Sequence, residues 1–445
     1  MAECTNPLVS HRTSAAPNDP GTKLKILWIY PELPYPLTTG LLRGFHLLRG
    51  LSERHAVTFL CLTRQGPVPP KTLEVLSTCA EQVMVFSTHD APKRRWAAMV
   101  RHVPVIGWRL CGAREFRWAM DQMKRAVQKL LKEQSFNVLL FNGRETLPLL
   151  EGIKIPIVAE CGDTNCTRIL QQMHCVSLLQ RPRIYYRYLR ELRQEKKLAG
   201  LTPYRCFISE RDRINLLGPS DQSEIVPQGV DCEYWTRNSP PSGKNCIVFS
   251  GVMNYPPNAD AVMFLMEAVL PLVRHTSPAL EVLIVGRDPS QKLRDAANAY
   301  PDTTIVGAVP DLRPYLERAD VFVAALRFAS GVQNKVLEAM SMEIPVITTP
   351  VVAAGLRIDG TEPPLLKGDD ARGIADCIVR MLTHPEERAH LSTEGRRFVR
   401  THYSWSTSAE KLAKLCLAAA QSGALVAERD RNSNHSLSAV LDRNL

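Results

Sequence analysis

The chain has 445 residues, a length typical of two domains rather than one. Its composition, with 45% hydrophobic and 22% charged residues, excludes a disordered protein, and no run approaches the ~20 consecutive apolar residues of a membrane-spanning helix. The formal net charge of +10 is modest for this length and no recognisable nucleic-acid-binding motif accompanies it, so we expect no nucleic-acid partner.

Short apolar runs alternate with helical patterns from residue 25 onward. The first series predicts strands at 25–30, 56–62, 82–87, 136–141 and 155–160, with a helix at about 41–54. Continuous apolar runs of this length, separated by helices, are typical of a parallel sheet that is buried on both faces.

A second series follows a segment rich in proline, glycine and serine. It predicts strands at 245–251, 279–286, 303–307, 319–325 and 344–349. The alternation predicts two doubly wound α/β domains facing a central cleft. The expected order is a flexible leader (1–22), a first domain (23–225), a linker (226–244), a second domain (245–405), a C-terminal helix packing back on the first domain (406–424) and a polar tail (425–445).

Two segments of the first domain combine basic and aromatic residues. Residues 93–118 carry seven Lys or Arg against one Glu, and residues 181–197 carry seven against two, with three tyrosines. One interpretation is a solvated helix face with some buried aromatic rings. The other is a surface for an anionic membrane or an anionic acceptor.

Several common catalytic motifs are missing from the sequence. Neither 25–30 nor 245–251 is followed by G-x-G-x-x-G, and the chain has no P-loop, no H-E-x-x-H and no G-x-S-x-G. This disfavours NAD-linked chemistry, common ATP hydrolysis, metalloproteases and α/β-hydrolases.

The most informative stretch is the polar loop and helix behind the predicted strand 319–325. Gly331 lets the backbone approach a ligand, and the following helix start offers free N–H groups to a phosphate. Lys335 adds a positive charge, and Glu338, one turn on, suits a vicinal diol such as a ribose. The alternative is a solvated helix start with an ordinary i,i+3 Lys–Glu pair.

The stretch "SGVQNKVLEAMSMEIPVITTP" resembles the donor-site motif of the family 4 retaining glycosyltransferases, commonly written Glu-x7-Glu followed by Ala-Met and a Gly-x-Pro-Val-Val-like strand. Glu338 matches the second glutamate, which in that family holds the ribose of a sugar nucleotide. Ser330 stands where the first glutamate is expected. Val252 and Pro257 stand where the family has an Arg and a Lys that clamp the donor diphosphate.

The segments "GVMNYPPN" and "GVQNK" resemble one bacterial subgroup of this family, the sugar transferases associated with exosortase and exopolysaccharide loci. The likeness is dense over residues 246–356 and weaker from 25 to about 420. It implies a GT-B architecture, two Rossmann-like domains with the donor bound mainly by the second. It also implies no metal and no cofactor beyond the nucleotide-sugar substrate.

The resemblance and the loop positions together give a set of candidate residues. For donor binding they are Gly251, Asn254, Tyr255, Arg287, Arg327, Ser330, Gly331, Gln333, Asn334, Lys335 and Glu338. Lys335 and Asp163 are the catalytic candidates, and the sequence indicates no general base. Gly40 and Arg43 are expected near the diphosphate and acceptor. Each loop cation could instead be solvated, Asp163 a plain turn residue, and the loop at Gly40 a simple helix cap.

These observations predict a glycosyltransferase that moves a sugar from a nucleotide-sugar donor to a glycan or lipid-linked acceptor in polysaccharide or exopolysaccharide biosynthesis. We expect retention of configuration, a cytoplasmic location and peripheral association with the inner face of the plasma membrane. The alternative is a catalytically degenerate protein of the same fold that binds a sugar nucleotide without turnover. A sugar-nucleotide epimerase would need acid and base residues that the sequence does not offer.

Overall fold

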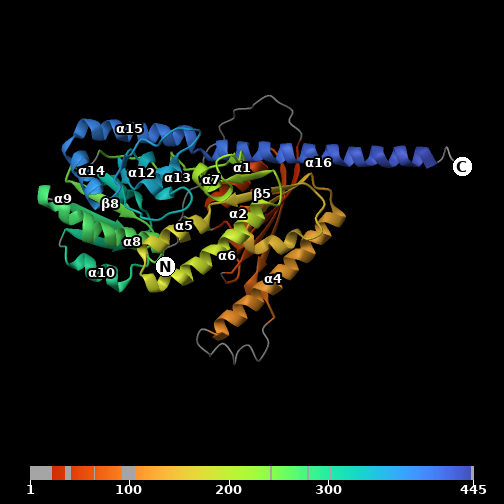
Figure 1. Ribbon diagram of the computed structural model, residues 1–445, viewed down its shortest axis with the longest axis horizontal. Coiled ribbons are helices and arrows are strands. Elements are labelled where there is room, and N and C mark those ends of the chain that lie inside the picture. Colours follow the sequence, from red (N-terminus) through yellow and green to blue (C-terminus); the bar gives the residue numbers. More distant parts are fainter. Residues whose placement is uncertain are drawn as a thin grey trace.

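The computed structural model describes residues 23–35, 42–64, 66–92, 106–240, 243–277, 280–300 and 302–441. For the helical segments 106–112 and 424–441 it describes only the backbone. Two α/β domains lie side by side, the first on the right of Figure 1 and the second on the left.

The first domain is built on a seven-stranded sheet in which every pairing is parallel, with the order β3-β2-β1-β4-β5-β6-β7. The strands are β1 (Lys25–Tyr30), β2 (Ala56–Thr63), β3 (Gln82–Ser87), β4 (Val138–Asn142), β5 (Ile157–Gly162), β6 (Arg205–Phe207) and β7 (Glu224–Ile225). The central strands are buried on both faces: in β1 only Lys25 is exposed, and the Trp28 ring packs edge-on against Phe59 at 5.3 Å.

The second domain is built on a six-stranded parallel sheet with the order β10-β9-β8-β11-β12-β13. Its strands are β8 (Cys246–Ser250), β9 (Glu281–Val285), β10 (Thr303–Gly307), β11 (Val321–Ala324), β12 (Val346–Thr348) and β13 (Leu366–Lys367). The strand order reverses between β8 and β11, and ligands of doubly wound sheets bind at such a switch point.

Helices cover both sheets. In the first domain they are α1 (Leu42–Ser52), α2 (Pro70–Ser77), α4 (Ile106–Glu133), α5 (Asn165–Gln172), α6 (Arg181–Ala199) and α7 (Glu210–Leu217). In the second they are α8 (Pro256–Phe264), α9 (Leu270–Thr276), α10 (Gln291–Asn298), α11 (Arg313–Glu317), α12 (Asn334–Ser341), α13 (Pro350–Leu356), α14 (Ala371–Thr383) and α15 (Pro385–His402). Short 3-10 turns lie at Thr88–Asp90, Arg144–Leu150, Met173–Cys175 and Leu178–Gln180, and one π turn at Leu265–Val269.

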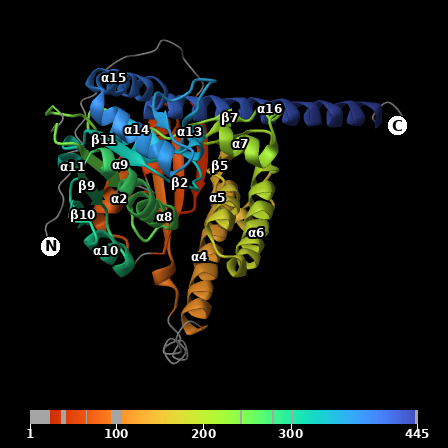
Figure 2. The ribbon, with the colours of Figure 1, turned by 60° about the vertical axis from the view of Figure 1, so that its left-hand side comes forward.

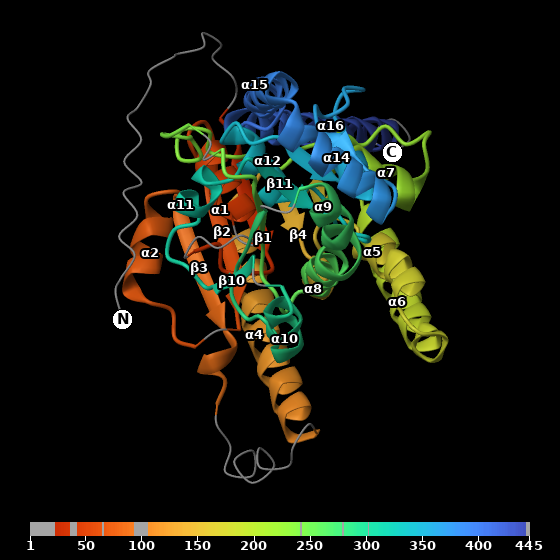
Figure 3. The same cartoon turned by 90° about the vertical axis from the view of Figure 1, so that its left-hand side faces the viewer.

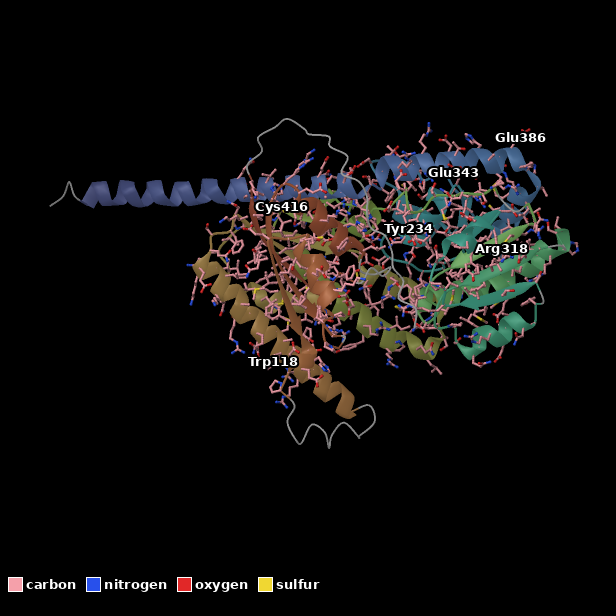
Figure 4. All side chains as sticks on the ribbon, turned by 180° about the vertical axis from the view of Figure 1, so that it is seen from behind. Trp118, Tyr234, Arg318, Glu343, Glu386 and Cys416 are labelled. Carbon is pink, nitrogen blue, oxygen red and sulfur yellow. The ribbon has the colours of Figure 1, made fainter. Side chains whose placement is uncertain are left out.

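The last helix, α16 (Trp405–Leu441), leaves the second domain and runs across the first (Figure 1). His46 on α1 stacks on the Trp405 ring at 4.6 Å, and a Cβ at Gly229 would lie 2.4 Å from that ring. Further along, Cys416 lies in the core of the first domain (Figure 4). The helix packs closely because Gly50 leaves room for Ala409.

The secondary structure differs from the sequence prediction in two respects. The C-terminal helix, expected at 406–424, is longer than predicted and takes in most of the polar tail, since α16 continues to Leu441; no glycine or proline follows Gly423 to end the helix. Strands β6, β7 and β13 were not predicted, because each is only two or three residues long and produces no apolar run.

Candidate donor site

Two loops flank the switch point of the second sheet. One follows β8 and contains Gly251, Asn254 and Tyr255, and the other, residues 325–333, follows β11 and leads into α12. We call the second one the β11 loop. In a view from the side of the second domain, β11 and α12 lie near the centre of the molecule (Figure 3). The fold therefore brings together, at one edge, candidates that are about 80 residues apart in sequence.

Lys335 lies in the first turn of α12 and reaches back toward the loop after β8. Its Nζ donates a hydrogen bond to Oδ1 of Asn258 and lies 4.8 Å from the centre of the Phe249 ring. Gly251 is required here, since a Cβ would lie 2.6 Å from Nδ2 of Asn258 and 3.0 Å from Nζ of Lys335. The ammonium group is thus held at the end of β8 with donors left for a ligand.

Glu338 lies one turn further along α12 and is 4% exposed. Within the described part of the chain no group donates a hydrogen bond to its carboxylate. Burial raises the pKa of Glu338 to about 7, an effect that the charge of Lys335 partly offsets. Burial likewise lowers the pKa of Lys335 to about 7, against the influence of Glu338. A buried carboxylate without a donor is costly and calls for an explanation, such as a ligand that supplies the missing hydrogen bonds.

The other predicted cations lie at the rim. Arg327 is paired with Asp260, with its Nε 2.8 Å from Oδ2, and stacks over the Phe264 ring. Arg287 is exposed and lies 3.3 Å from Asp288, which also accepts from Nδ2 of Asn254 at 3.3 Å. Among the described contacts neither arginine binds Lys335 or Glu338, so the structure groups the candidates into a buried centre and an exposed rim.

The β11 loop contacts the first domain. The backbone N–H of Ala329 donates to Gln171 Oε1 at 3.1 Å, and Ser330 Oγ donates to Oδ2 of Asp163 at 2.8 Å. Inside the loop, Gln333 Nε2 donates to the Ser330 carbonyl at 2.9 Å. Asp163, which follows β5, therefore lies against Ser330, the position where the sequence lacks the glutamate of the resembled motif.

Sequence reasoning missed the first-domain side chains that complete this region. Cζ of Arg168 on α5 lies 5.6 Å from the centre of the Tyr255 ring. Arg211 and Asp212 on α7 bind the backbone of Gly331. The available signal was the cap "SERD", in which Ser209 Oγ accepts from the backbone of Asp212; nothing in the sequence connects this helix to a loop about 120 residues away.

The first-domain candidates have different surroundings. Arg43 is buried, and its three guanidinium nitrogens donate to Glu160, to the Pro227 carbonyl and to the Val226 carbonyl. Gly40 lies outside the described residues, as do 93–105 of the basic segment 93–118. The guanidinium of Arg43 is thus hydrogen-bonded to other groups of the protein. The prediction for Gly40 stays untested.

A cavity of about 460 Å³, lined by charged, polar and proline residues, lies elsewhere, between the linker, the start of β11 and α15. Its charged residues already have partners: Arg237 donates to the Glu317 and Ala319 carbonyls, and Asp320 accepts from the backbone of Cys246. These contacts tie the linker to the second domain. The cavity contains none of the predicted site residues, and we do not assign it a ligand.

The described residues contain neither a cluster suited to a metal ion nor a helix suited to span a membrane. No group of three or more His, Cys, Asp or Glu side chains there could hold a metal ion. No helix in the described part of the chain is both long and apolar enough to cross a membrane.

Comparisons with known proteins find similarity to glycosyltransferases. Residues 244–384 match the family model described as "Glycosyl transferases group 1". A phosphatidyl-myo-inositol mannosyltransferase of Mycolicibacterium smegmatis is 27% identical over 217 residues, 47% of this chain and 54% of that protein. The chain thus matches about half the length of this curated relative.

The solved structures cover more of the chain. The Anabaena HepE structure in complex with UDP and glucose has a TM-score of 0.59 at 12% identity, covering 89% of this chain and all of HepE. Sucrose-phosphate synthase from Thermosynechococcus elongatus has a TM-score of 0.61 at 16% identity, covering 88% and 98%. The two parallel sheets and these neighbours confirm the predicted GT-B fold, and the segment that matches the glycosyl transferases contains the buried Lys335 and Glu338.

Proposed function

We propose that this protein is a glycosyltransferase that transfers a sugar from a nucleotide-sugar donor to a glycan or lipid-linked acceptor. The observation that carries the proposal is Glu338, a buried carboxylate with no hydrogen-bond donor among the described residues, one turn behind Lys335 at a switch point. A ribose diol would supply two donors to Glu338, and Lys335 with the N-terminus of α12 would face the diphosphate.

The finer part of the proposal rests on the sequence resemblance. The segments at Gly251–Asn258 and Gly331–Lys335 are similar to the family 4 retaining transferases of the exosortase and exopolysaccharide subgroup. We therefore propose retention of configuration and a role in exopolysaccharide biosynthesis. We also propose that positive side chains and the α12 N-terminus, rather than a metal ion, balance the leaving diphosphate, so that transfer persists in excess EDTA.

The decisive test compares the wild type with Glu338→Ala. UDP-sugars are the first donors to screen, because HepE structures contain UDP-glucose or UDP and glucose. Two charge-assisted hydrogen bonds removed together should weaken donor binding by about 10- to 100-fold by calorimetry. Unchanged affinity in the variant would refute the ribose assignment. A wild type that binds a donor without releasing nucleoside diphosphate, across a panel of glycan and lipid acceptors, would instead identify the degenerate binding protein.

Membrane association is the part of the proposal that concerns the acceptor. Helix α6 and the turn before it expose apolar side chains, with Leu178 at 73%, Leu179 at 94% and Tyr186 at 70% exposed. Exposed arginines 183, 187 and 190 lie on the same helix. Figure 2 shows α6 and α4 extending toward the same lower edge of the first domain. Apolar side chains flanked by basic ones favour an anionic lipid surface.

The membrane proposal has its own matched experiment. Leu179→Glu should reduce co-sedimentation with phosphatidylserine vesicles at low salt severalfold, since it inserts a charge into the apolar contact. Leu272→Glu, on α9 of the second domain and 41% exposed, is the control and should leave binding unchanged. If the two variants bound vesicles equally well, Leu179 and its surroundings on α6 would not be the lipid contact.

A further inference from the structure

The first domain holds three consecutive residues of the β11 loop. Ala329 is bound by Gln171, Ser330 by Asp163, and Gly331 by both Arg211 and Asp212. All of these partners belong to the first domain, whereas Lys335 and Glu338 belong to α12 of the second. The loop that leads into the donor site is therefore held from both sides: Arg327 pairs with Asp260 of its own domain, whereas residues 329–331 bind side chains of the first domain.

Gly331 is held on both sides of its backbone. Its N–H donates to Oδ2 of Asp212 at 3.0 Å, and its carbonyl accepts from Nη2 of Arg211 at 3.0 Å. Its φ of +60° lies in the left-handed region, and a Cβ would lie 2.9 Å from the Cβ of Asp163. Only glycine fits this contact, because a side chain would push the two domains apart.

Asp212 is well suited to a fixed role. It is fully buried, and besides the Gly331 N–H it accepts hydrogen bonds from Thr164 Oγ1 at 2.7 Å and Ser209 Oγ at 2.5 Å. Three donors from three different segments fix the orientation of the carboxylate. It therefore connects the end of β5, the start of α7 and the β11 loop.

Arg211 reaches a second element of the other domain. Nη1 donates to the Val351 carbonyl on α13, while Nη2 binds Gly331. Gly355, also on α13, leaves room for this arrangement, since a Cβ there would lie 2.6 Å from the Gly331 oxygen and 3.1 Å from Nη1 of Arg211. The planar guanidinium thus holds the β11 loop against α13, a geometry that lysine does not reproduce.

We propose that Arg211 and Asp212 are positioning residues of the donor site. By fixing the peptide groups of Gly331, they give the β11 loop its productive shape only when the two domains are in contact. This inference rests on the proposed function and deepens it. We call Arg211 and Asp212, with their hydrogen bonds to Gly331, the clamp. Lys335 and Glu338 on α12 do not depend on the clamp for their positions. The part of the loop around Ser330, which precedes α12 and faces the first domain, depends on it.

The expected consequence is a separation of binding from turnover. Removing the clamp should leave the affinity for UDP within about threefold, because Glu338 and Lys335 keep their places. It should lower kcat by about 10- to 100-fold, since a displacement on the order of 1 Å costs that much in a transfer reaction. A merely structural role would instead lower UDP affinity and turnover together with the melting temperature.

Arg211→Ala tests this, with Arg213→Ala as its matched control. Arg213 lies on the same helix and also donates to a backbone carbonyl, that of Asp221, but within the first domain. We expect faster hydrogen–deuterium exchange in a peptide covering 325–333 and a lower kcat for Arg211→Ala, and neither for Arg213→Ala. Arg211→Gln, which keeps most of the side-chain volume, replaces the alanine variant if that variant does not fold.

The outcomes separate this inference from the proposed function. Unchanged exchange in the Arg211 variant would overturn the clamp even if no donor were ever found. Faster exchange with unchanged kcat would overturn its positioning role, as would equal losses of UDP affinity and kcat. A wild type that binds no nucleotide sugar would refute the proposed function, and the exchange experiment would still decide whether the clamp holds the loop.

Discussion

The two domains each bury a positive and a negative side chain, and the two sites differ in how completely these groups are hydrogen-bonded. In the first domain, all three nitrogens of Arg43 have acceptors, and Glu160 accepts from both Arg43 and Asn142. In the second domain, Lys335 has one acceptor, Asn258, and Glu338 has no donor among the described residues. Both sets lie at the carboxyl ends of parallel strands, so position alone does not distinguish them.

Hydrogen bonding does distinguish them. A buried charge with every partner in place has no capacity for a ligand, and it stabilises the fold only while both partners remain. A buried charge with missing partners costs stability in the free protein and is retained where a ligand completes it. The comparison assigns Arg43 to the link between the first sheet and the linker, and Glu338 to binding.

The largest effect should come from breaking the fully hydrogen-bonded pair of the first domain, Arg43 and Glu160. Arg43→Ala leaves Glu160 buried at 1% exposure, removes the Arg43 donor to the Val226 carbonyl and leaves the Pro227 carbonyl with the hydroxyl of Ser408. We expect a loss of about 3–5 kcal/mol in the free energy of unfolding, measured by urea denaturation. The control is Arg54→Ala, since Arg54 and Glu410 form an exposed pair at 3.3 Å whose loss should cost under ~1 kcal/mol. Equal costs would show that burial does not decide the difference.

The next largest effect should come from Lys335, which belongs to the incompletely hydrogen-bonded pair of the second domain. It should appear in donor binding rather than in the stability of the fold. Lys335→Met removes a charge facing the proposed diphosphate and should weaken donor binding by about 10- to 100-fold. Urea denaturation should show a smaller change than for Arg43→Ala, because within the described part of the chain the ammonium donates one hydrogen bond, to Asn258. Lys292→Met, at an exposed position of α10, controls for net charge. If Lys335→Met lowered the free energy of unfolding but bound the donor normally, Lys335 would be a structural residue rather than a binding residue.

How far the sequence predicted this comparison depends on the range of the contacts. The central strands and the group Gly331, Lys335 and Glu338 were predictable, because apolar runs and a contiguous loop–helix pattern are local. The partner of Arg43 lies 117 residues away, and Asp212 lies 119 residues from Gly331. Such contacts arise when sheet order and domain packing bring distant segments together, which no local pattern encodes. The sequence therefore named Arg43, Lys335 and Glu338 as ligand-binding candidates alike, did not name Glu160, and did not distinguish the role of Arg43 from that of the other two.

A smaller effect should appear in the stability of the free protein. The pKa of Glu338 in the folded state is raised to about 7 by burial, so its contribution to stability is present below pH ~4.5 and is lost as the pH rises through 7. Glu338→Gln removes the ionised carboxylate and should raise the free energy of unfolding at pH 8 by about 1 kcal/mol. The gain should vanish near pH 4. A variant that is less stable at pH 8 would mean that the carboxylate has a donor in solution.

The smallest effect should be the pH dependence of donor affinity. Binding requires Glu338 ionised and Lys335 protonated, and their pKa values, raised and lowered by burial, both lie at about 7. The diphosphate of a sugar nucleotide stays ionised throughout this range. Affinity should therefore peak near pH 7 and fall about threefold at one pH unit on either side. Glu338→Gln should lose the acidic limb and Lys335→Met the alkaline one. A pH-independent donor affinity in the wild type would mean that neither Glu338 nor Lys335 changes protonation on binding. It would contradict the assignment of Glu338 to ligand binding and make it comparable to the hydrogen-bonded Glu160.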